Sequence, residues 1–175
     1  SYRFSTSWAR VMPDGKTVNP EGLDYYDRLV DAIVERGIKP NLTLYHWELP
    51  SAMADIGGWA NRETPMRFAD MTRAVIERIG DRVERVATIN EPWCVTWLGY
   101  MIGIHAPGVK NLDSALAAAH HTALAHAEAS RVMKAIDPSI KTGIALNMTT
   151  YRIEDENDAE LAELGDLMDA QLNRW

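Results

Sequence analysis

The feature that most constrains the fold is a strict alternation of strand-like and helical segments along the whole chain. Segments rich in β-branched, aromatic or other apolar residues are predicted to form strands at 2–8, 41–45, 83–89 and 141–146. Segments with apolar residues at helical spacing follow them, at 20–36, 64–79, 113–136 and 161–172. Alternation of this kind is typical of parallel strands with the helices packed outside them.

The length of the chain limits which parallel architecture it can complete. Its 175 residues divide into four strand–helix units of about 44 residues each, whereas an eightfold barrel needs about 250 residues or more. The chain therefore has room for an α/β fold that is about half of a (β/α)8 TIM barrel, although the pattern alone does not exclude an open sheet. An open, doubly wound sheet has the same alternation, but no strand is followed by a glycine-rich phosphate loop, which weakens a nucleotide-binding interpretation.

Local signals predict where the helices begin and end. Asn19-Pro20 is an N-cap followed by proline, and Gly37 ends the same helix. Asp113-Ser114 is predicted to cap the long alanine-rich helix. The stretch 51–59 is predicted to be a loop with at most one helical turn, and 94–110 a long connection.

Composition excludes several classes of function. The net charge is −7 and the basic residues are scattered, so neither nucleic acid nor an anionic membrane is an expected partner. No apolar run approaches the roughly 18 residues of a membrane span. The single cysteine, Cys94, excludes an internal disulfide framework and predicts a reducing, cytoplasmic location. The first residues lack the features of a signal peptide, and both ends of the sequence look cut.

Polar and aromatic side chains gather where the predicted strands end. His46 and Trp47 follow the second strand, Asn90 and Glu91 the third, and Asn147 the fourth. In a parallel barrel these ends share one rim, which is where such barrels carry their chemistry. An indole stacks on the apolar face of a sugar, a glutamic acid can protonate a leaving glycosidic oxygen, and an asparagine can bind the sugar 2-hydroxyl. The sequence therefore predicts a carbohydrate site.

Other polar residues have less specific interpretations. Arg3 lies in a strand predicted to be buried, where its charge needs an anionic partner that is either structural or catalytic. Cys94 is predicted to be a small buried residue, and His105 lies in a loop with no assigned role. Residues 154–158 are predicted to be a solvated acidic loop without the ligand pattern of a calcium site. Packing or surface positions are expected for the histidines of the alanine-rich helix, His120, His121 and His126.

Several stretches together closely resemble family 1 glycoside hydrolases, the retaining β-glucosidases and their relatives. The matching stretches are Tyr2 to Arg10, Leu44 to Pro50, Gly57-Gly58-Trp59 with Asn61-Arg62, Thr88 to Cys94, Gly103 to Gly108, and Asn173-Arg174-Trp175. The resemblance implies that residues 1–175 are a partial barrel domain covering roughly strands two to five. Glu48 replaces the aspartate more usual in the family's motif.

The resemblance also implies roles for individual residues. Glu91 would be the general acid/base, and Asn90 would hold the 2-hydroxyl. His46 and Trp47 would line the subsite of the glycone, the sugar being released. Arg3 would lie near the nucleophile and favour its ionised form. Asn147 would border the leaving-group side.

The nucleophile of such an enzyme is a second glutamate, and no stretch of this sequence resembles its motif. Glu48 and Glu154 are candidates by position only. The predicted function is hydrolysis of β-D-glucosidic bonds with retention of configuration, with the nucleophile outside this segment. The expected substrate is a β-glucoside or small oligosaccharide, with galactosides or fucosides as further candidates.

The resemblance implies neither a metal nor an organic cofactor, and the segment alone is expected to be inactive. Two alternatives remain open. One is a non-catalytic half-barrel that binds sugars or assembles with itself or a partner, because half a barrel exposes two strand edges. The other is a related barrel endoglycosidase.

Overall fold

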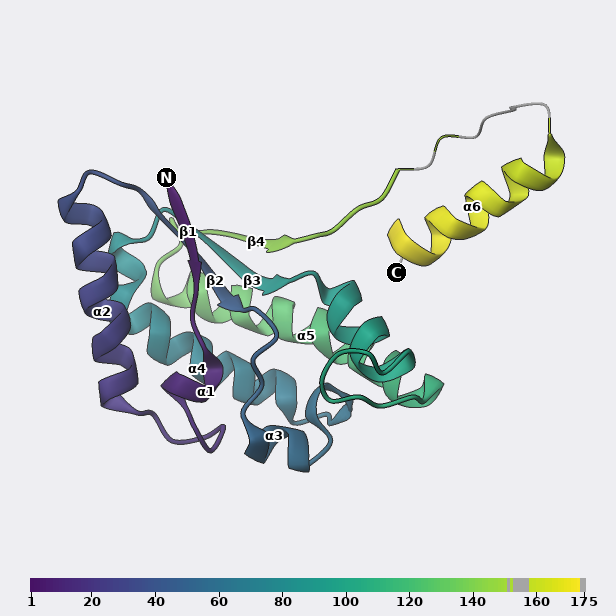
Figure 1. The fold of residues 1–175 in the computed structure, drawn as a ribbon. Helices are drawn as coiled ribbons and strands as arrows, with labels where there is room; N and C mark the ends of the chain where they lie inside the picture. The colour runs from purple at the N-terminus through teal and green to yellow at the C-terminus, as the bar shows by residue number, and fades with distance from the viewer. Residues whose placement is uncertain (151, 153–157, 174–175) are drawn as a thin grey trace. The chain divides into compact units, whose positions relative to one another are not determined.

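The computed structural model describes residues 1–150, 152 and 158–173 (Figure 1). It divides into two compact units, Ser1–Ala145 and Leu146–Trp175, and each is described by itself. The predictions for the acidic residues 154–157, including the nucleophile candidate Glu154, and for Arg174 and Trp175 lie outside the described residues. No helix of the described residues is long and apolar enough to cross a membrane.

The first unit is built on a parallel four-stranded sheet whose strand order follows the chain. Its strands are β1 (Tyr2–Ser5), β2 (Pro40–Tyr45), β3 (Arg85–Asn90) and β4 (Lys141–Ala145), in the order β1-β2-β3-β4. The register pairs Ser5 with Thr43 and Asn90 with Ala145, with an irregularity of β3 between Ala87 and Asn90. The predicted parallel arrangement is confirmed, and so are the second, third and fourth predicted strands to within two residues at each end.

The first strand is shorter than predicted. Residues 2–8 were expected to be extended, but the chain turns into the short helix α1 (Trp8–Val11). The cause is the burial of the Trp8 indole, which is 0% exposed and packs against Phe68 with ring centroids 5.6 Å apart. Tertiary packing of this aromatic ring therefore overrides the alternating pattern of the sequence.

Long helices cover one face of the sheet, as Figure 1 shows for the first unit. They are α2 (Pro20–Glu35), α4 (Thr64–Ile79) and α5 (Leu112–Ile136). Short helical segments lie between strands and helices: α3 (Ser51–Asp55) and η1 (Gly58–Ala60) between β2 and α4, and η2 (Gly80–Arg82) between α4 and β3. The predicted cap of α5 was wrong, because Asn111 is its N-cap and accepts the Ser114 backbone N–H at 2.8 Å.

The connection predicted after β3 contains regular structure. Cys94–Met101 form a π-helix, η3, in which the Ile102 N–H closes the last turn by donating to the Trp97 carbonyl at 2.7 Å. The Thr96 hydroxyl donates to the Pro92 carbonyl at 3.0 Å, which satisfies one carbonyl of the wider turn. Single-turn π-helices are often found at functional sites.

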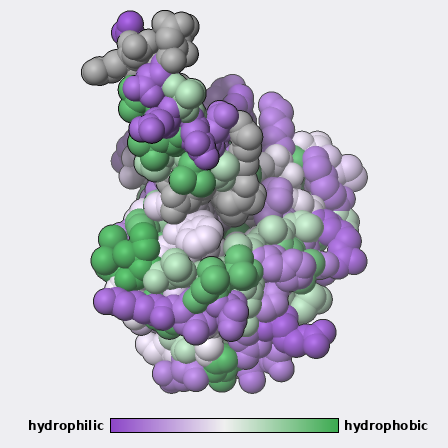
Figure 2. Space-filling model, turned by 90° about the vertical axis from the view of Figure 1, so that its right-hand side faces the viewer, coloured by the Kyte–Doolittle hydropathy of each residue, from purple (hydrophilic) through white to green (hydrophobic). Residues whose placement is uncertain are grey.

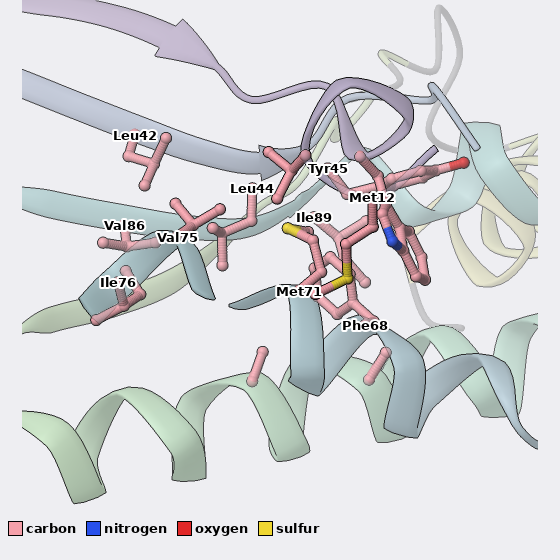
Figure 3. Close-up of a cluster of buried hydrophobic side chains, with 14 of the residues drawn as sticks. Met12, Leu42, Leu44, Tyr45, Phe68, Met71, Val75, Ile76, Val86 and Ile89 are labelled. Atoms are coloured by element: carbon pink, nitrogen blue, oxygen red, sulfur yellow. The ribbon is translucent and has the colours of Figure 1, made fainter. Parts of the chain in front are cut away.

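The core lies between the sheet and α4 (Figure 3). Leu42 and Leu44 from β2 and Val86 from β3 face Met71 and Val75 of α4, and all five are at most 1% exposed. A cluster of edge-to-face and tilted aromatic rings closes the core under the carboxyl end of the sheet, formed by Trp8, Tyr45, Trp59 and Phe68.

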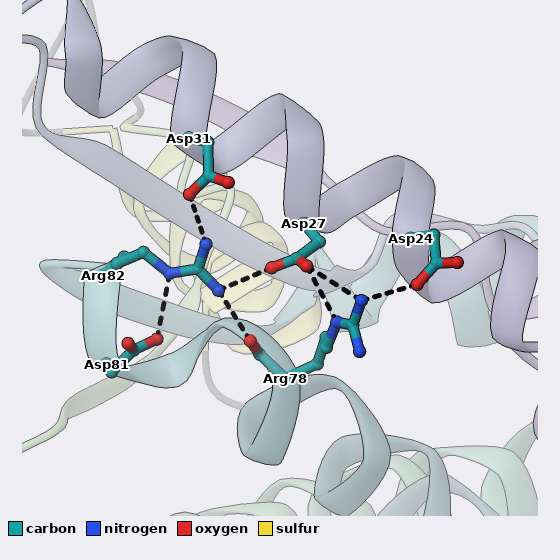
Figure 4. Close-up of polar contacts among 6 residues, drawn as sticks. All are labelled: Asp24, Asp27, Asp31, Arg78, Asp81 and Arg82. Atoms are coloured by element: carbon teal, nitrogen blue, oxygen red, sulfur yellow. Dashed lines mark hydrogen bonds and ion pairs between the residues drawn. The ribbon is translucent and has the colours of Figure 1, made fainter.

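An ion-pair network joins α2 to the end of α4 and to η2 (Figure 4). Arg82 pairs with Asp27 at 2.6 Å, with Asp81 at 3.1 Å, and also with Asp31. Arg78 pairs with Asp24 at 2.6 Å and with Asp27 at 2.9 Å. Arg82 holds the pKa of the Asp27 carboxyl below its usual range.

The other unit contains the helix α6 (Ala159–Asn173). Asp158 caps its start by accepting the Glu160 N–H at 3.0 Å. The Asn173 side chain near its end both accepts from and donates to the backbone of Thr149, at 3.1 and 2.8 Å. The predicted last helix is therefore confirmed.

Candidate active site

The carboxyl ends of β1, β2 and β3 are joined by a network of polar side chains. From β1, the Arg3 guanidinium donates to the Thr43 hydroxyl at 2.8 Å and to the Asn90 side-chain oxygen at 2.6 Å. The Trp47 indole N–H, just beyond β2, donates to the Asn90 backbone carbonyl at 2.8 Å. The structure thus brings Arg3, Trp47 and Asn90 together, with Thr43 as an additional member.

Arg3 differs from its predicted environment. It is exposed, although the strand was expected to bury it, and its hydrogen-bond partners Thr43 and Asn90 are neutral. Its neighbour Phe4 is the buried residue of β1, and adjacent residues of a strand point to opposite faces, so Arg3 lies on the face opposite Phe4. Its predicted role beside a nucleophile stays a prediction.

Glu91 follows β3 directly and has a left-handed backbone conformation, with φ of 46°. Its N–H donates to the Ala145 carbonyl of β4 at 2.7 Å, and its carbonyl accepts the Val95 N–H at 3.2 Å. Its half-buried side chain accepts from the Cys94 thiol, whose Sγ is 3.3 Å from Oε2. Uncommon backbone conformations in non-glycine residues cluster at active sites, where the surrounding contacts maintain them.

Trp47 is the second non-glycine residue with a positive φ, at 79°. The His46 ring meets its indole edge-on with centroids 5.2 Å apart. The His105 ring lies against it with centroids also 5.2 Å apart, tilted by 45°. The indole is 37% exposed, so its orientation is fixed by these contacts while part of its surface stays open to a ligand.

A cavity of about 560 Å³ adjoins these residues. Its walls are mainly aromatic and apolar, and they include Trp47, Glu48, Trp59, Cys94, Tyr100 and His105. Burial raises the pKa of the Tyr100 phenol to about 12, and the phenol oxygen accepts the Trp59 N–H at 2.7 Å. A largely apolar cavity with a few polar groups is typical of a small-molecule site.

Sequence reasoning missed two members of this region. Thr43 is a polar residue that is 0% exposed in the middle of a strand, and only its burial marks it. His105 lies in the loop after η3, where its backbone N–H donates to the Leu98 carbonyl at 3.0 Å. The only sequence signal for His105 was its place in the matching stretch from Gly103 to Gly108.

Of the histidines of α5, His120 is exposed and the other two are partly buried, which agrees with the expected packing or surface positions. His121 hydrogen-bonds the Trp59 carbonyl at 2.9 Å, and His126 hydrogen-bonds the Thr88 hydroxyl of β3 at 2.8 Å. Burial lowers the pKa of His126. The described part of the chain contains no group of three or more His, Cys, Asp or Glu side chains placed to hold a metal ion.

Asn147 belongs to the unit Leu146–Trp175, so its predicted role on the leaving-group side stays a prediction.

Figure 2 shows hydrophobic side chains among hydrophilic ones on a face turned by 90° from Figure 1. Exposed large hydrophobic residues of the first unit include Ile102, Ile104, Leu112 and Leu116. Such side chains are common where another part of a protein covers a surface.

Comparison with known proteins adds relatives of known activity. A curated beta-glucosidase from Agrobacterium sp. is 45% identical over 162 residues, which are 92% of this chain and 35% of that protein. Beta-glucosidase A from Thermotoga maritima is 42% identical over 162 residues, which are 92% of this chain and 36% of that protein. The chain therefore spans little more than a third of these relatives.

Solved structures agree with the sequence relatives. The psychrophilic beta-glucosidase BglU from Micrococcus antarcticus has a TM-score of 0.95 at 49% identity, covering 99% of this chain and 37% of its own. A complex of the virulence factor SghA with its substrate analog salicin has a TM-score of 0.93 at 43% identity, covering 98% and 38%. The prediction of a partial (β/α)8 barrel is confirmed by these fold matches.

The family assignment rests on a match along the entire chain. The sequence profile of glycosyl hydrolase family 1 matches residues 1–175. The resemblance seen in the motifs around Trp47 and Glu91 is thereby confirmed, and the chain belongs to glycosyl hydrolase family 1.

Proposed function

We propose that the complete protein hydrolyses β-D-glucosidic bonds with retention of configuration, and that Glu91 is its general acid/base. The observation that carries the proposal is the carboxyl of Glu91 at the end of β3, directly after an Asn90 side chain that Arg3 holds. Relatives named beta-glucosidases support the reaction and the glucoside substrate.

The reaction needs two carboxyl groups about 5–5.5 Å apart. In the first step Glu91 gives its proton to the glycosidic oxygen while the bond from that oxygen to the anomeric carbon breaks. A carboxylate from elsewhere in the complete protein forms a bond to the anomeric carbon. In the second step Glu91 takes a proton from water, the water oxygen attacks the anomeric carbon, and the nucleophile leaves.

The contacts of Asn90 fix how its amide can meet a sugar. Its Oδ1 accepts from Arg3 at 2.6 Å, so its Nδ2 is oriented to donate to a sugar hydroxyl. We assign that hydroxyl to the sugar 2-position, where a contact that strengthens in the transition state accelerates the reaction. The Arg3 guanidinium has further N–H groups, and these suit the carboxylate of the nucleophile.

Trp47 and His46 suit the subsite for the glycone. The indole N–H of Trp47 already donates to the Asn90 carbonyl, so its ring surface rather than its N–H is available to the C–H groups of a sugar. His46 is exposed next to it and can donate or accept at a hydroxyl. The apolar cavity beside Cys94 suits the aglycone, such as an aryl group of the kind in the salicin bound by SghA.

The test is the Glu91→Gln variant of the complete enzyme, assayed as kcat/KM on glucosides with different leaving groups. The leaving oxygen of an alkyl glucoside needs a proton, so kcat/KM on this substrate should fall about 10²–10⁴-fold, the usual contribution of a general acid. Dinitrophenolate leaves without a proton, so kcat/KM on the dinitrophenyl glucoside should fall far less. The control is Glu48→Gln, because the exposed Glu48 borders the same cavity. Equal losses of kcat/KM on both substrates would mean that Glu91 is not the acid.

A further inference from the structure

We propose that the thiol of Cys94 is a positioning group for the acid/base, and that it determines which oxygen of the Glu91 carboxyl carries the transferable proton. The inference rests on the proposed function, because it gives Cys94 a role only through Glu91. The sequence prediction that Cys94 is a small buried residue is confirmed, and the proposal adds a role for its thiol.

The contact between the Cys94 thiol and the Glu91 carboxyl joins residues close in sequence, and backbone hydrogen bonds hold Glu91 in place. Cys94 is the first residue of η3 and lies three positions after Glu91, which places its Sγ 3.3 Å from Oε2. The backbone of Glu91 is tied on both sides, to Ala145 by its N–H and to Val95 by its carbonyl. With φ at 46°, Glu91 leaves the strand direction, and its side chain returns toward the first turn of η3.

The environment of the thiol favours a stable contact. Cys94 is 7% exposed and lies in the wall of the 560 Å³ cavity, so water competes little for its S–H group. A thiol is a weak donor in water, but a hydrogen bond to an ionised or polar acceptor strengthens where the surroundings are dry. Oε2 is therefore the oxygen with a fixed donor, and Oε1 is the oxygen that this contact leaves for the substrate.

The consequence for proton transfer follows from the bonding of a carboxyl group. The S–H group points at a lone pair of Oε2, so in the acid form Oε2 is the carbonyl oxygen and the proton resides on Oε1. When the glycosidic bond breaks, the Oε1–H proton passes to the leaving oxygen, and the new negative charge of Glu91 is shared with Oε2, where the thiol already donates. When water attacks in the second step, Oε1 accepts its proton. The thiol neither loses its proton nor changes oxidation state.

This role predicts an effect that follows the leaving group. A donor to Oε2 stabilises the carboxylate that forms as Glu91 gives up its proton, so its loss slows the steps in which Glu91 is the acid. A thiol that merely fills space would affect all substrates alike through folding or cavity shape. The comparison of Cys94→Ala with Cys94→Ser separates the two, because serine keeps a donor at this position and alanine removes it.

The experiment measures kcat/KM of the complete enzyme on an alkyl and a dinitrophenyl glucoside for Cys94→Ala, Cys94→Ser and Glu91→Gln. Cys94→Ala should lower kcat/KM on the alkyl glucoside about fivefold, which corresponds to a hydrogen bond worth about 1 kcal/mol. On the dinitrophenyl glucoside it should lower kcat/KM by less than about twofold. Cys94→Ser should stay within about twofold of the parent on both. Thermal melts check that each variant is folded.

Any other pattern in the cysteine variants overturns the proposal. Equal losses on both glucosides, no loss for Cys94→Ala, or the same selective loss for Cys94→Ser each mean that the thiol does not act through a hydrogen bond to Glu91. The Glu91→Gln variant separates this failure from a failure of the proposed function. If Glu91→Gln discriminates between leaving groups and Cys94→Ala does not, only the role of the thiol is wrong.

Discussion

Replacing Gly58 by alanine should destabilise the protein next to Tyr100, which lines the cavity of the candidate site. Gly58 has a φ of 55°, and a Cβ atom at this position would lie 2.3 Å from the Tyr100 hydroxyl and 3.1 Å from Leu49 Cδ2. The Tyr100 hydroxyl accepts the backbone N–H of Trp59 at 2.7 Å. The methyl group would therefore displace the phenol and leave a buried N–H without its acceptor.

The magnitude follows from two contributions. A left-handed conformation in a residue with a Cβ costs about 1 kcal/mol. An unsatisfied buried donor costs about 1–3 kcal/mol, so Gly58→Ala should lower the free energy of unfolding by about 2–4 kcal/mol. Gly37→Ala is the matched control, because Gly37 has a φ of 68° with nothing within 4 Å of its added Cβ. It should lose only the first contribution, about 1 kcal/mol.

The assay is urea unfolding of the complete protein, followed by circular dichroism. Tyr100→Phe removes the atom that the new methyl group meets, so in that background Gly58→Ala should lower the free energy of unfolding by only about 1 kcal/mol. If Gly58→Ala lowers the free energy of unfolding no more than Gly37→Ala does, the methyl group does not displace the Tyr100 phenol. The same conclusion follows if Gly58→Ala lowers the free energy of unfolding by the same amount in the Tyr100→Phe background.

Two further predictions concern pH and charge. Arg82→Ala should lower the melting temperature more than Arg73→Ala, whose single pair with Glu77 is 3.8 Å long. Arg82 lowers the pKa of Asp27 in the folded state, so the stability that this ion pair contributes is lost once the carboxyl is protonated. The difference in melting temperature caused by Arg82→Ala should therefore shrink as the pH falls below 3.8. A difference that persists in acid would contradict this. Burial lowers the pKa of His126 from 6.5, so stability should fall as the pH drops through 6.5 toward the folded pKa. His126→Gln should reduce that slope in urea midpoints, and an unchanged slope would exclude His126 as its source.

Much of the fold could be predicted because the periodicity is regular. The positions of β2, β3 and β4 and of the helices after Asn19 and Thr64 follow from apolar spacing and from proline and glycine signals. The π-helix η3 could not be predicted, because its wide turns depend on tertiary contacts. One of these is the close approach of Gly99, where an added Cβ would lie 2.9 Å from the Ala106 carbonyl oxygen.

The residue types of the candidate site could be predicted, but their conformations could not. The strand-end rule identified Trp47, Asn90 and Glu91, and the first two of them hydrogen-bond each other. The left-handed φ of Trp47 and Glu91 leaves no signal in a single sequence, since such conformations are maintained by surrounding contacts. The contact of Cys94 with Glu91 and the position of His105 follow from those conformations and were missed with them.

The strand order of the sheet also affects how the chain is made. Because β1, β2, β3 and β4 neighbour one another in chain order, each strand that emerges from a ribosome finds the edge it pairs with already present. The loop of chain that must be closed to pair each new strand is then only one strand–helix unit long, which keeps the entropic cost of each pairing low. This four-stranded sheet can therefore assemble strand by strand during synthesis.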